Sequence, residues 1–331
     1  MVVPSYTSRA AKNYLSTARE CLSVGETAKG RRMAQAALSL PACARDTHVQ
    51  ATALCVLSQA CVLDSRFRLA YRLSSRAGRL FRRHSDADGQ AESLAILSYS
   101  AATLTKCEQA SRAARESVAL RAHSKSALVQ SLGLNYSGVA AFWARDFGSS
   151  SGVLDAAAWL VKGHSRSAVA SFQPLVNRAF CEVLRVVEPE RNGWSSHEYS
   201  FLTDTVSLAG ATERNEATGF LNKVTADIGL LLLDFERCFL ASRLGQLDEA
   251  DEHYLHCLSR ASRVPRSSWL HAILWWSRLE RAKAKGQVGS AIASAAAMRQ
   301  AAIAGEHLQL ASLAARFESL LWSEIDIRDE M

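Results

Sequence analysis

The sequence predicts an all-α protein built as a solenoid of stacked helical hairpins, and three observations support this prediction. The chain has 331 residues, of which 48% are hydrophobic and 21% charged, a composition typical of a folded chain rather than a disordered one. It contains only 5 prolines and 17 glycines, so long uninterrupted helices are favoured over many short strands. At many positions, residues 40 positions apart have side chains of similar size, which indicates a repeated structural unit.

The 40-residue period is visible in columns that align when the chain is shifted along itself. One column holds only leucine, another only glutamine, and a third only small residues. Three copies with matched side-chain sizes predict three successive units that pack in the same way. These columns are Leu54, Leu94 and Leu134; Gln50, Gln90 and Gln130; and Ser58, Ser98 and Gly138.

Each unit has the pattern of two amphipathic helices joined by a short polar turn. In the second unit, apolar residues recur at spacings of three and four over 47–63 and over 67–83, and Asp64-Ser65-Arg66 separates the two runs. A short joint of this kind folds the two helices back antiparallel. A single hairpin cannot bury both of its faces, so successive hairpins are expected to stack.

Seven such units and a terminal helix account for the chain. The fifth unit is degenerate, with a helix expected at 166–187, a turn at 188–193 and a second helix at 196–211. The period returns with the joint at 245–250, which is repeated 41 positions later at 286–291. The expected units of this single domain, 1–331, are 8–41, 46–84, 87–125, 126–164, 166–215, 220–263 and 266–302, followed by a capping helix at 305–326.

Charge and cysteine content indicate the environment of the chain. The formal net charge is +7, with 31 arginines against 8 lysines, a usage that favours a GC-rich bacterial source. The 8 cysteines form no Cys-x-x-Cys pair and most lie among apolar helical positions, which favours a reducing compartment over a disulfide framework. No signal-peptide core is visible, and no apolar run reaches the roughly 20 residues of a membrane span. We therefore expect a cytoplasmic protein with no membrane partner.

The repeated unit resembles the tetratricopeptide repeat. Its clearest instance is 243–258, with a turn glycine at Gly245, an apolar residue at Leu247, a small residue at Ala250 and an aromatic at Tyr254. The period of 40–42 residues is longer than the roughly 34 of the family and is similar to repeat arrays of bacterial signalling proteins. The resemblance implies a right-handed superhelix in which the first helix of each hairpin lines a concave, partner-binding groove.

The groove-facing positions of that family give a candidate partner-binding surface in this chain. The later part of the surface is aromatic, and exposed aromatic side chains in a concavity suit a peptide or helix with apolar anchors. The alternative is that these aromatic side chains pack against neighbouring units. The candidate groove residues are Gln59, Tyr99, Asn135, Phe142, Phe235, Phe239, Trp276, Glu280 and Lys283.

A second candidate surface is a row of five arginines on the helix expected at 67–83. They lie within an arc of about 80° on one helix face, and such a row can contact an acidic partner or phosphates. The row belongs to a second helix, which is expected on the convex side, and it does not continue into the next units. A solvated helix face is therefore favoured over an acidic partner, and nucleic acid is the least favoured. The row consists of Arg68, Arg72, Arg76, Arg79 and Arg83.

Catalytic and cofactor-binding patterns are not found in the sequence. His253, His256 and Cys257 have the spacing of metal ligands on one side of a helix, but a fourth ligand is not evident, so surface histidines and no metal are expected. There is no glycine-rich phosphate loop and no Gly-x-Ser-x-Gly or His-Glu-x-x-His motif. The sequence thus predicts a module that is not an enzyme and holds no cofactor.

The favoured hypothesis is a non-catalytic protein- or peptide-binding module, acting as an adaptor or as the sensory part of a bacterial signalling system. One alternative is binding of an acidic partner or nucleic acid through the arginine row. Another is a regulatory array that acts with a separate diguanylate-cyclase or transcription-factor output. An enzyme with a site between units is disfavoured, because α-solenoids mostly present surfaces rather than closed pockets.

Overall fold

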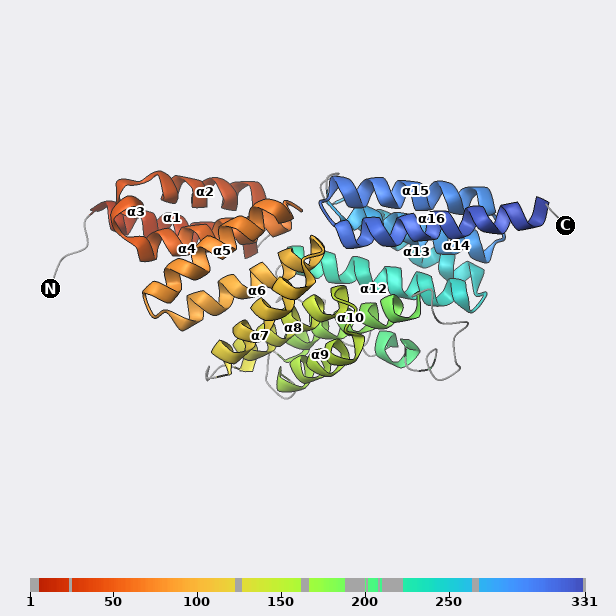
Figure 1. The fold of residues 1–331 in the computed structure, drawn as a ribbon, viewed down its shortest axis with the longest axis horizontal. Helices are drawn as coiled ribbons and strands as arrows, with labels where there is room; N and C mark the ends of the chain where they lie inside the picture. The colour runs from red at the N-terminus through yellow and green to blue at the C-terminus, as the bar shows by residue number, and fades with distance from the viewer. Residues whose placement is uncertain are drawn as a thin grey trace.

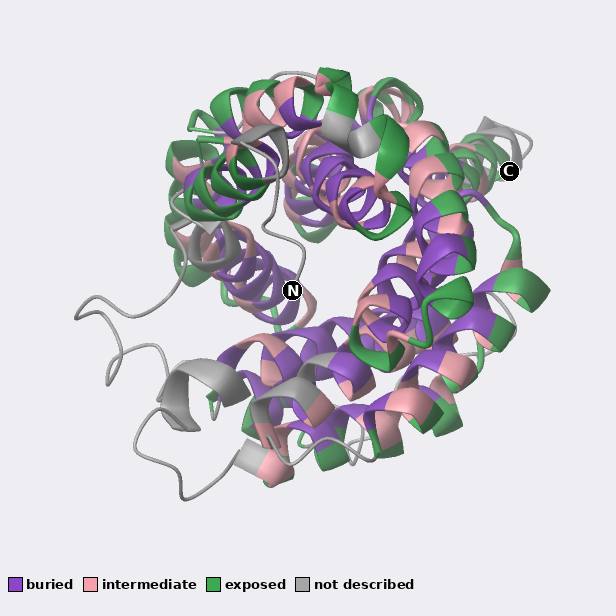
Figure 2. Ribbon diagram, turned by 90° about the vertical axis from the view of Figure 1, so that its left-hand side faces the viewer, coloured by how far each residue is buried: buried purple, intermediate pink, exposed green. Residues whose placement is uncertain are grey.

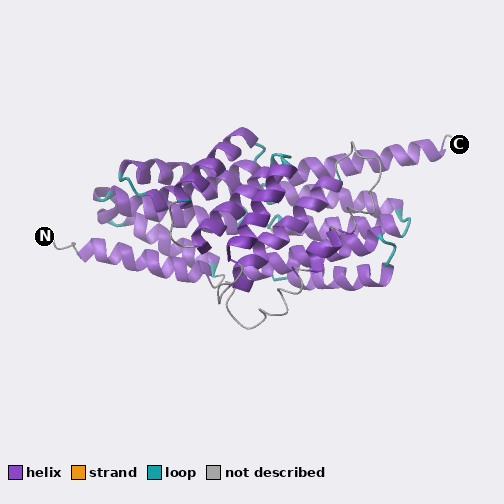
Figure 3. Ribbon diagram, turned by 90° about the horizontal axis from the view of Figure 1, so that it is seen from below, coloured by secondary structure: helices purple, strands orange, loops and turns teal. Residues whose placement is uncertain are grey.

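Every regular element that the structure describes is a helix. The computed structural model describes residues 6–23, 26–122, 127–161, 167–187, 200, 202–207, 209, 223–263 and 268–329. Within these residues there is no strand, and Figure 3 shows helices joined by short loops. The all-α class predicted from the sequence is therefore confirmed.

The helices pack as consecutive antiparallel pairs that stack along the chain (Figure 1). Each of α4, α6, α8, α12 and α14 pairs with the helix that follows it and also packs on the first helix of the neighbouring pair. The helices are α1 (Tyr6–Ser23), α2 (Thr27–Ser39), α3 (Pro41–Arg45), α4 (Thr47–Leu63), α5 (Phe67–Arg83), α6 (Ala87–Thr103), α7 (Cys107–Arg121), α8 (Ala127–Trp143), α9 (Phe147–Val161), α10 (Ser167–Val186), α12 (Lys223–Arg243), α13 (Leu247–Ala261), α14 (Leu270–Ala284), α15 (Val288–Ala304) and α16 (Leu308–Asp329).

Helix positions follow the expected pattern closely where the repeat is regular. The helices expected at 47–63 and 67–83 are α4 and α5 with the same bounds. The short helix α3 was not expected; it begins at Pro41, where the fixed φ and missing N–H of proline suit the first helical turn. The turn at 188–193 and most of the helix at 196–211 fall outside the described residues, although 202–207 are helical.

The turns between the two helices of a hairpin share one backbone conformation. Ser65, Thr105 and Arg145, which are 40 residues apart, have φ of 57°, 63° and 66°, and Gly245 and Gly286 have φ of 74° and 67°. In each turn the next residue donates its N–H back to the last turn of the first helix, for example Arg66 to the carbonyl of Cys61 at 2.8 Å. This left-handed helix ending satisfies carbonyls that would otherwise lack partners, so it ends the first helix of each of these hairpins in the same way.

The first helices of the hairpins are buried on most sides, whereas the second helices present a polar face to solvent (Figure 2). The small-residue column lies at the close approach of helices, because Ser58 and Ser98 are fully buried. At Gly138 a Cβ atom would lie 2.5 Å from Cγ of Leu154, which is far below van der Waals contact. The small residues therefore serve the packing role that the period predicts.

The stacked hairpins wind around a common axis, so that the C-terminal hairpins return toward the N-terminal ones (Figures 1 and 2). Helix α16 packs on α15 and also contacts α6, far away in the sequence. Among the described helices, none is long and apolar enough to cross a membrane.

Candidate binding site

The two ends of the array meet at a seam, where the α15–α16 turn and the start of α14 contact earlier hairpin turns. Glu306 Oε2 accepts a hydrogen bond from the backbone N–H of Arg68 at 2.8 Å, and Gln309 Nε2 donates to Cys107 Sγ at 3.5 Å. Ser65 Oγ accepts from the backbone N–H of Trp269 at 3.2 Å. These contacts join residues more than 200 positions apart and close the superhelix at this point.

His307 lies at the centre of the seam and is fully buried. Its ring centroid is 4.5 Å from that of Trp143, 5.0 Å from Trp269 and 5.9 Å from Phe67. Nδ1 accepts from the N–H of Leu310 at 3.3 Å and so caps the start of α16. Burial lowers the pKa of His307 to about 3, so this imidazole is neutral at neutral pH.

A cleft opens beside the seam, between the end of α8, the α8–α9 turn, α10 and the first turns of α16. Its cavity volume is about 30 Å³, and it is partly open to solvent. We call it the seam cleft; its lining is Phe142, Trp143, Arg145, Phe147, Leu184, Gln309, Leu313 and Arg316.

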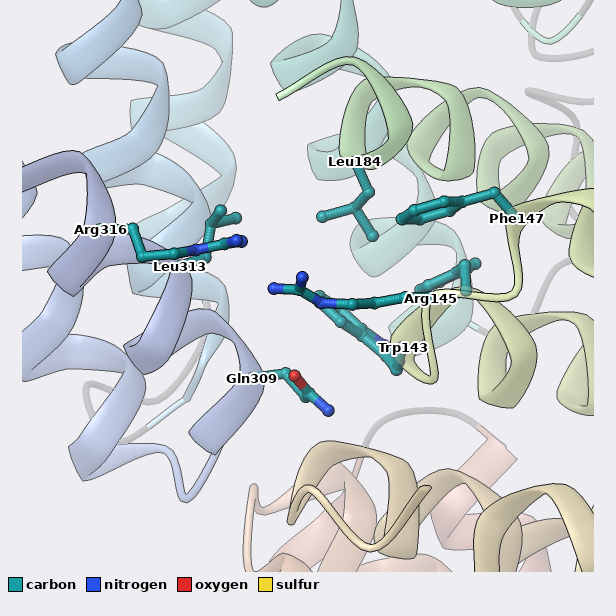
Figure 4. A pocket seen from close by; sticks show the side chains of 8 residues that line it. Trp143, Arg145, Phe147, Leu184, Gln309, Leu313 and Arg316 are labelled. Carbon is teal, nitrogen blue, oxygen red and sulfur yellow. The ribbon is translucent and has the colours of Figure 1, made fainter. Parts of the chain in front are cut away.

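The lining of the seam cleft combines an apolar wall with two cations. Figure 4 shows the side chains of Arg145 and Arg316 directed toward each other from opposite sides, with Phe147 and Leu184 on one wall. Arg145 is exposed and Arg316 is half-buried. Two guanidinium groups that face one another raise the local positive potential, and their planar forks match carboxylate or phosphate oxygens. The cleft can therefore hold an anionic group beside an apolar one.

Solved structures with this arrangement of helices come from helical-repeat proteins. A Rap protein complexed with Competence and Sporulation Factor is similar over 96% of this chain and 99% of its own, with a TM-score of 0.56 at 9% identity. This fold is a tetratricopeptide-type α-solenoid. A tetratricopeptide repeat protein from Parabacteroides merdae covers 93% of this chain and 99% of its own, with a TM-score of 0.49 at 11% identity. No protein-family model and no curated protein sequence matches the chain.

Three of the expected groove residues lie in the core of the solenoid. Phe235, Phe239 and Trp276 are fully buried and stack on one another, with 4.8 Å between the ring centroids of Phe235 and Trp276. This corrects the expectation of exposed aromatic side chains: the alternative, packing against neighbouring units, is what the solenoid shows. The reason is its tight winding, which leaves these faces of α12 and α14 in contact with α10 and α16 through Phe180 and Phe317.

The polar members of the expected groove also form internal contacts. Asn135 is buried and accepts a hydrogen bond from Nδ2 of Asn177 at 2.8 Å. Glu280 is buried and accepts from Nε1 of Trp276 at 3.1 Å, and it pairs with Arg243 at 2.9 Å. The structure therefore gives Asn135 and Glu280 partners within the solenoid.

The remaining groove residues differ in their accessibility. Gln59 and Tyr99 are partly buried on α4 and α6, and the ring of Tyr99 packs edge-on against Phe67 at 5.6 Å. Lys283 is exposed near the end of α14. Phe142 is buried, yet it belongs to the lining of the seam cleft. Phe142 therefore connects the expected groove with this cleft.

The five arginines of the expected basic row are all exposed on the outer helix α5. Arg79 donates to the hydroxyl of Ser75 at 2.9 Å within the same helix. The buried side of α5 includes Ala77 and Phe81, as the sequence predicts. The row therefore lies on a solvated helix face, and its binding role stays a prediction.

Sequence reasoning missed the other residues of the seam cleft. Arg145 occupies a hairpin turn, and Gln309 and Arg316 belong to the helix expected to act only as a cap. The period assigns each of these residues to its own unit and gives no signal that the units meet. The sequence alone does not distinguish these residues from other positions, because they come together only when the superhelix closes. They are Trp143, Arg145, Phe147, Gln309 and Arg316.

Proposed function

We propose that the protein is a non-catalytic peptide- or protein-binding module whose ligand is anchored in the seam cleft. The observation that carries this proposal is the combination of an aromatic and aliphatic wall with two facing guanidinium groups. This combination lies beside Phe142, a residue of the expected groove. The cavity volume of about 30 Å³ is small, so the cleft holds the end of one side chain of a longer segment.

The lining defines the chemistry of the anchor. Phe147, Leu184 and Leu313 offer an apolar surface, while Arg145 and Arg316 attract a carboxylate. The ligand is therefore a protein segment with an apolar side chain next to an acidic one, and the rest of the segment follows the partly buried surface of α4 and α6. The complex of the Rap protein with Competence and Sporulation Factor supports a binding role for this fold.

The wider role that we propose is an adaptor or the sensory part of a bacterial, cytoplasmic signalling system, with any diguanylate-cyclase or transcription-factor output on a separate chain. A second binding mode is an acidic partner on the exposed arginine row of α5. Both modes use positive charge, so an experiment must separate the two surfaces.

The test is selection of random peptides displayed on phage against the full chain, followed by affinity measurement of the enriched sequences. We expect enrichment of peptides with adjacent apolar and acidic residues. In the double variant Arg145→Asn with Arg316→Gln their affinity falls by about tenfold or more, since each charge-assisted contact contributes roughly 1.5–3 kcal/mol. Asparagine is chosen at position 145 because it tolerates the positive φ there.

The matched control is Arg72→Gln with Arg76→Gln, which removes the same charge from the outer face of α5. Unchanged affinity in this control places the ligand at the seam cleft rather than on the arginine row. Equal weakening in both variants, or weakening only in the control, overturns the proposed site.

A further inference from the structure

The hairpin α12–α13 contains a polar cluster where three earlier hairpins have leucines. Asp234 lies 11 residues before the turn residue Gly245, the position held by Leu54, Leu94 and Leu134 in three earlier hairpins. Arg260 lies 15 residues after that turn, the position of Leu80, Leu120 and Leu160. In hairpin α4–α5 the corresponding Leu54 and Leu80 belong to one apolar cluster. A buried carboxylate and its arginine thus replace an apolar pair.

This replacement gives no gain in folding stability over leucines, so the polar groups are expected to have another role. Asp234 is 1% exposed, and desolvation of a buried ion pair commonly offsets its attraction, so leucines at the same positions would stabilise the hairpin at least as well. Two histidines of α13, His253 and His256, face the same carboxylate. A carboxylate with two imidazoles is the ligand type that zinc prefers.

The geometry of the cluster is convergent. One ligand atom from each of Asp234, His253 and His256 lies within 4.8 Å of the other two. Ligands about 2.1 Å from a tetrahedral zinc ion are about 3.4 Å apart, so the three atoms need to approach by a little over an ångström. His256 is about half exposed, with a side-chain exposure of 52%, so its ring can make this adjustment.

The two oxygens of Asp234 have different surroundings. Oδ2 accepts from Nε of Arg260 at 2.5 Å, whereas Oδ1 faces Nδ1 of His256 at 3.9 Å and the guanidinium of Arg237 at 3.7 Å. Arg260 therefore orients the carboxylate in the way that outer partners orient metal ligands, and Oδ1 points to the imidazoles. Arg237 is partly exposed and can turn to solvent when a cation takes its place.

The state of His253 is also suitable for coordination. Its Nδ1 is buried and has no hydrogen-bond partner among the described residues. Burial, followed by the nearby charge of Arg237, lowers the pKa of His253, which favours the neutral ring that binds metals. Cys257 does not belong to the cluster, because it is buried and accepts from the hydroxyl of Ser277 at 3.7 Å.

We propose that Asp234, His253 and His256 form a binding site for a zinc ion, with an open coordination position toward solvent, that links α13 to α12. The site was not expected from the sequence because its carboxylate comes from the neighbouring helix rather than from the His-x-x-His segment. It is separate from the seam cleft and does not depend on the proposed peptide binding.

The test is titration of the full, chelator-treated chain with Co²⁺, whose visible absorption reports coordination geometry, followed by displacement with Zn²⁺. We expect one equivalent of Co²⁺ to bind with the spectrum of a nitrogen and oxygen ligand set, and Zn²⁺ to displace it. The variant His256→Ala removes a half-exposed ligand and is expected to keep the fold while weakening binding by at least tenfold. Zn²⁺ is also expected to raise the unfolding temperature of the wild type but not of the variant.

The matched control is His84→Ala, which removes an exposed histidine of α5–α6 that contacts Thr47 instead of the cluster. Unchanged metal affinity in His84→Ala together with loss in His256→Ala supports the site. A sulfur-to-cobalt charge-transfer band, equal binding by wild type and His256→Ala, or no Co²⁺ spectrum at all would overturn it.

Discussion

The inside of a hairpin and the seam are held by different kinds of contact. Within hairpin α4–α5, Leu54 and Leu80 pack in one apolar cluster, and leucines occupy the same two positions in the next two hairpins, α6–α7 and α8–α9. At the seam, Glu306 bonds to the backbone of Arg68 across 238 residues, and His307 is enclosed by aromatic side chains from three separate units. Local repetition determines the first kind of contact, whereas the second depends on the rotation accumulated over all the hairpins. The candidate binding site lies at the second.

The largest expected effect concerns the buried aromatic core of Trp276, to which the seam residues Phe67, Trp143 and Trp269 also belong. Trp276→Ala removes a fully buried side chain that packs on Phe180, Phe235 and Phe317, so it is expected to cost about 3–5 kcal/mol in the free energy of unfolding. Trp159→Ala is the control, since Trp159 is 73% exposed and its loss is expected to change stability by less than about 0.5 kcal/mol. Urea unfolding followed by circular dichroism measures both. Equal stabilities would contradict the burial of Trp276.

The next prediction concerns the pH dependence of folding stability that comes from His307, a residue of the seam and not of a hairpin interior. The pKa of His307 is about 3 in the folded chain and 6.5 when exposed, so the unfolded chain binds an extra proton as pH falls below 6.5. Folding stability from this residue is therefore present above pH 6.5 and is lost on acidification toward pH 3. Between pH 7 and pH 5 the loss is about 2 kcal/mol.

The variant His307→Asn isolates this contribution, because asparagine also caps helices but does not titrate. Its unfolding free energy is expected to fall less between pH 7 and pH 5 than that of the wild type, by about 2 kcal/mol. Equal changes in the two proteins would show that His307 is accessible to protons, and that the seam is open in solution.

The smallest effect concerns a helix cap supplied from far along the chain. Helices α4 and α6 are capped by Asp46 and Asp86, but Arg66 gives α5 no side-chain cap. The carboxylate of Glu306 accepts from the second residue of α5 instead. In Glu306→Asn, asparagine suits the positive φ, but its side chain is too short to reach the N–H of Arg68. The free energy of unfolding is therefore expected to fall by about 1 kcal/mol.

The control for the cap is Glu306→Gln, which retains an acceptor oxygen at the same reach. Hydrogen exchange of the first amides of α5 is expected to accelerate in Glu306→Asn and to change little in Glu306→Gln. No acceleration in Glu306→Asn would mean that the cap of α5 does not depend on the seam.

The sequence predicts contacts that recur and misses those that occur once. The period places α4 and α5 at their observed bounds and identifies the small residues at close approaches, because each depends on a neighbouring hairpin. It does not show that Phe235 and Trp276 are covered, because their burial requires the winding of the whole solenoid. Arg145 and Arg316 meet for the same reason, and no local pattern relates them.

The most direct test of the central claim is hydrogen exchange of the full chain with and without an enriched apolar–acidic peptide. If the seam cleft holds the ligand, protection increases in 142–147 and in 308–316, while α5 exchanges as before. Protection confined to 68–83 on the outer face of α5, with no change at the seam, would contradict the account.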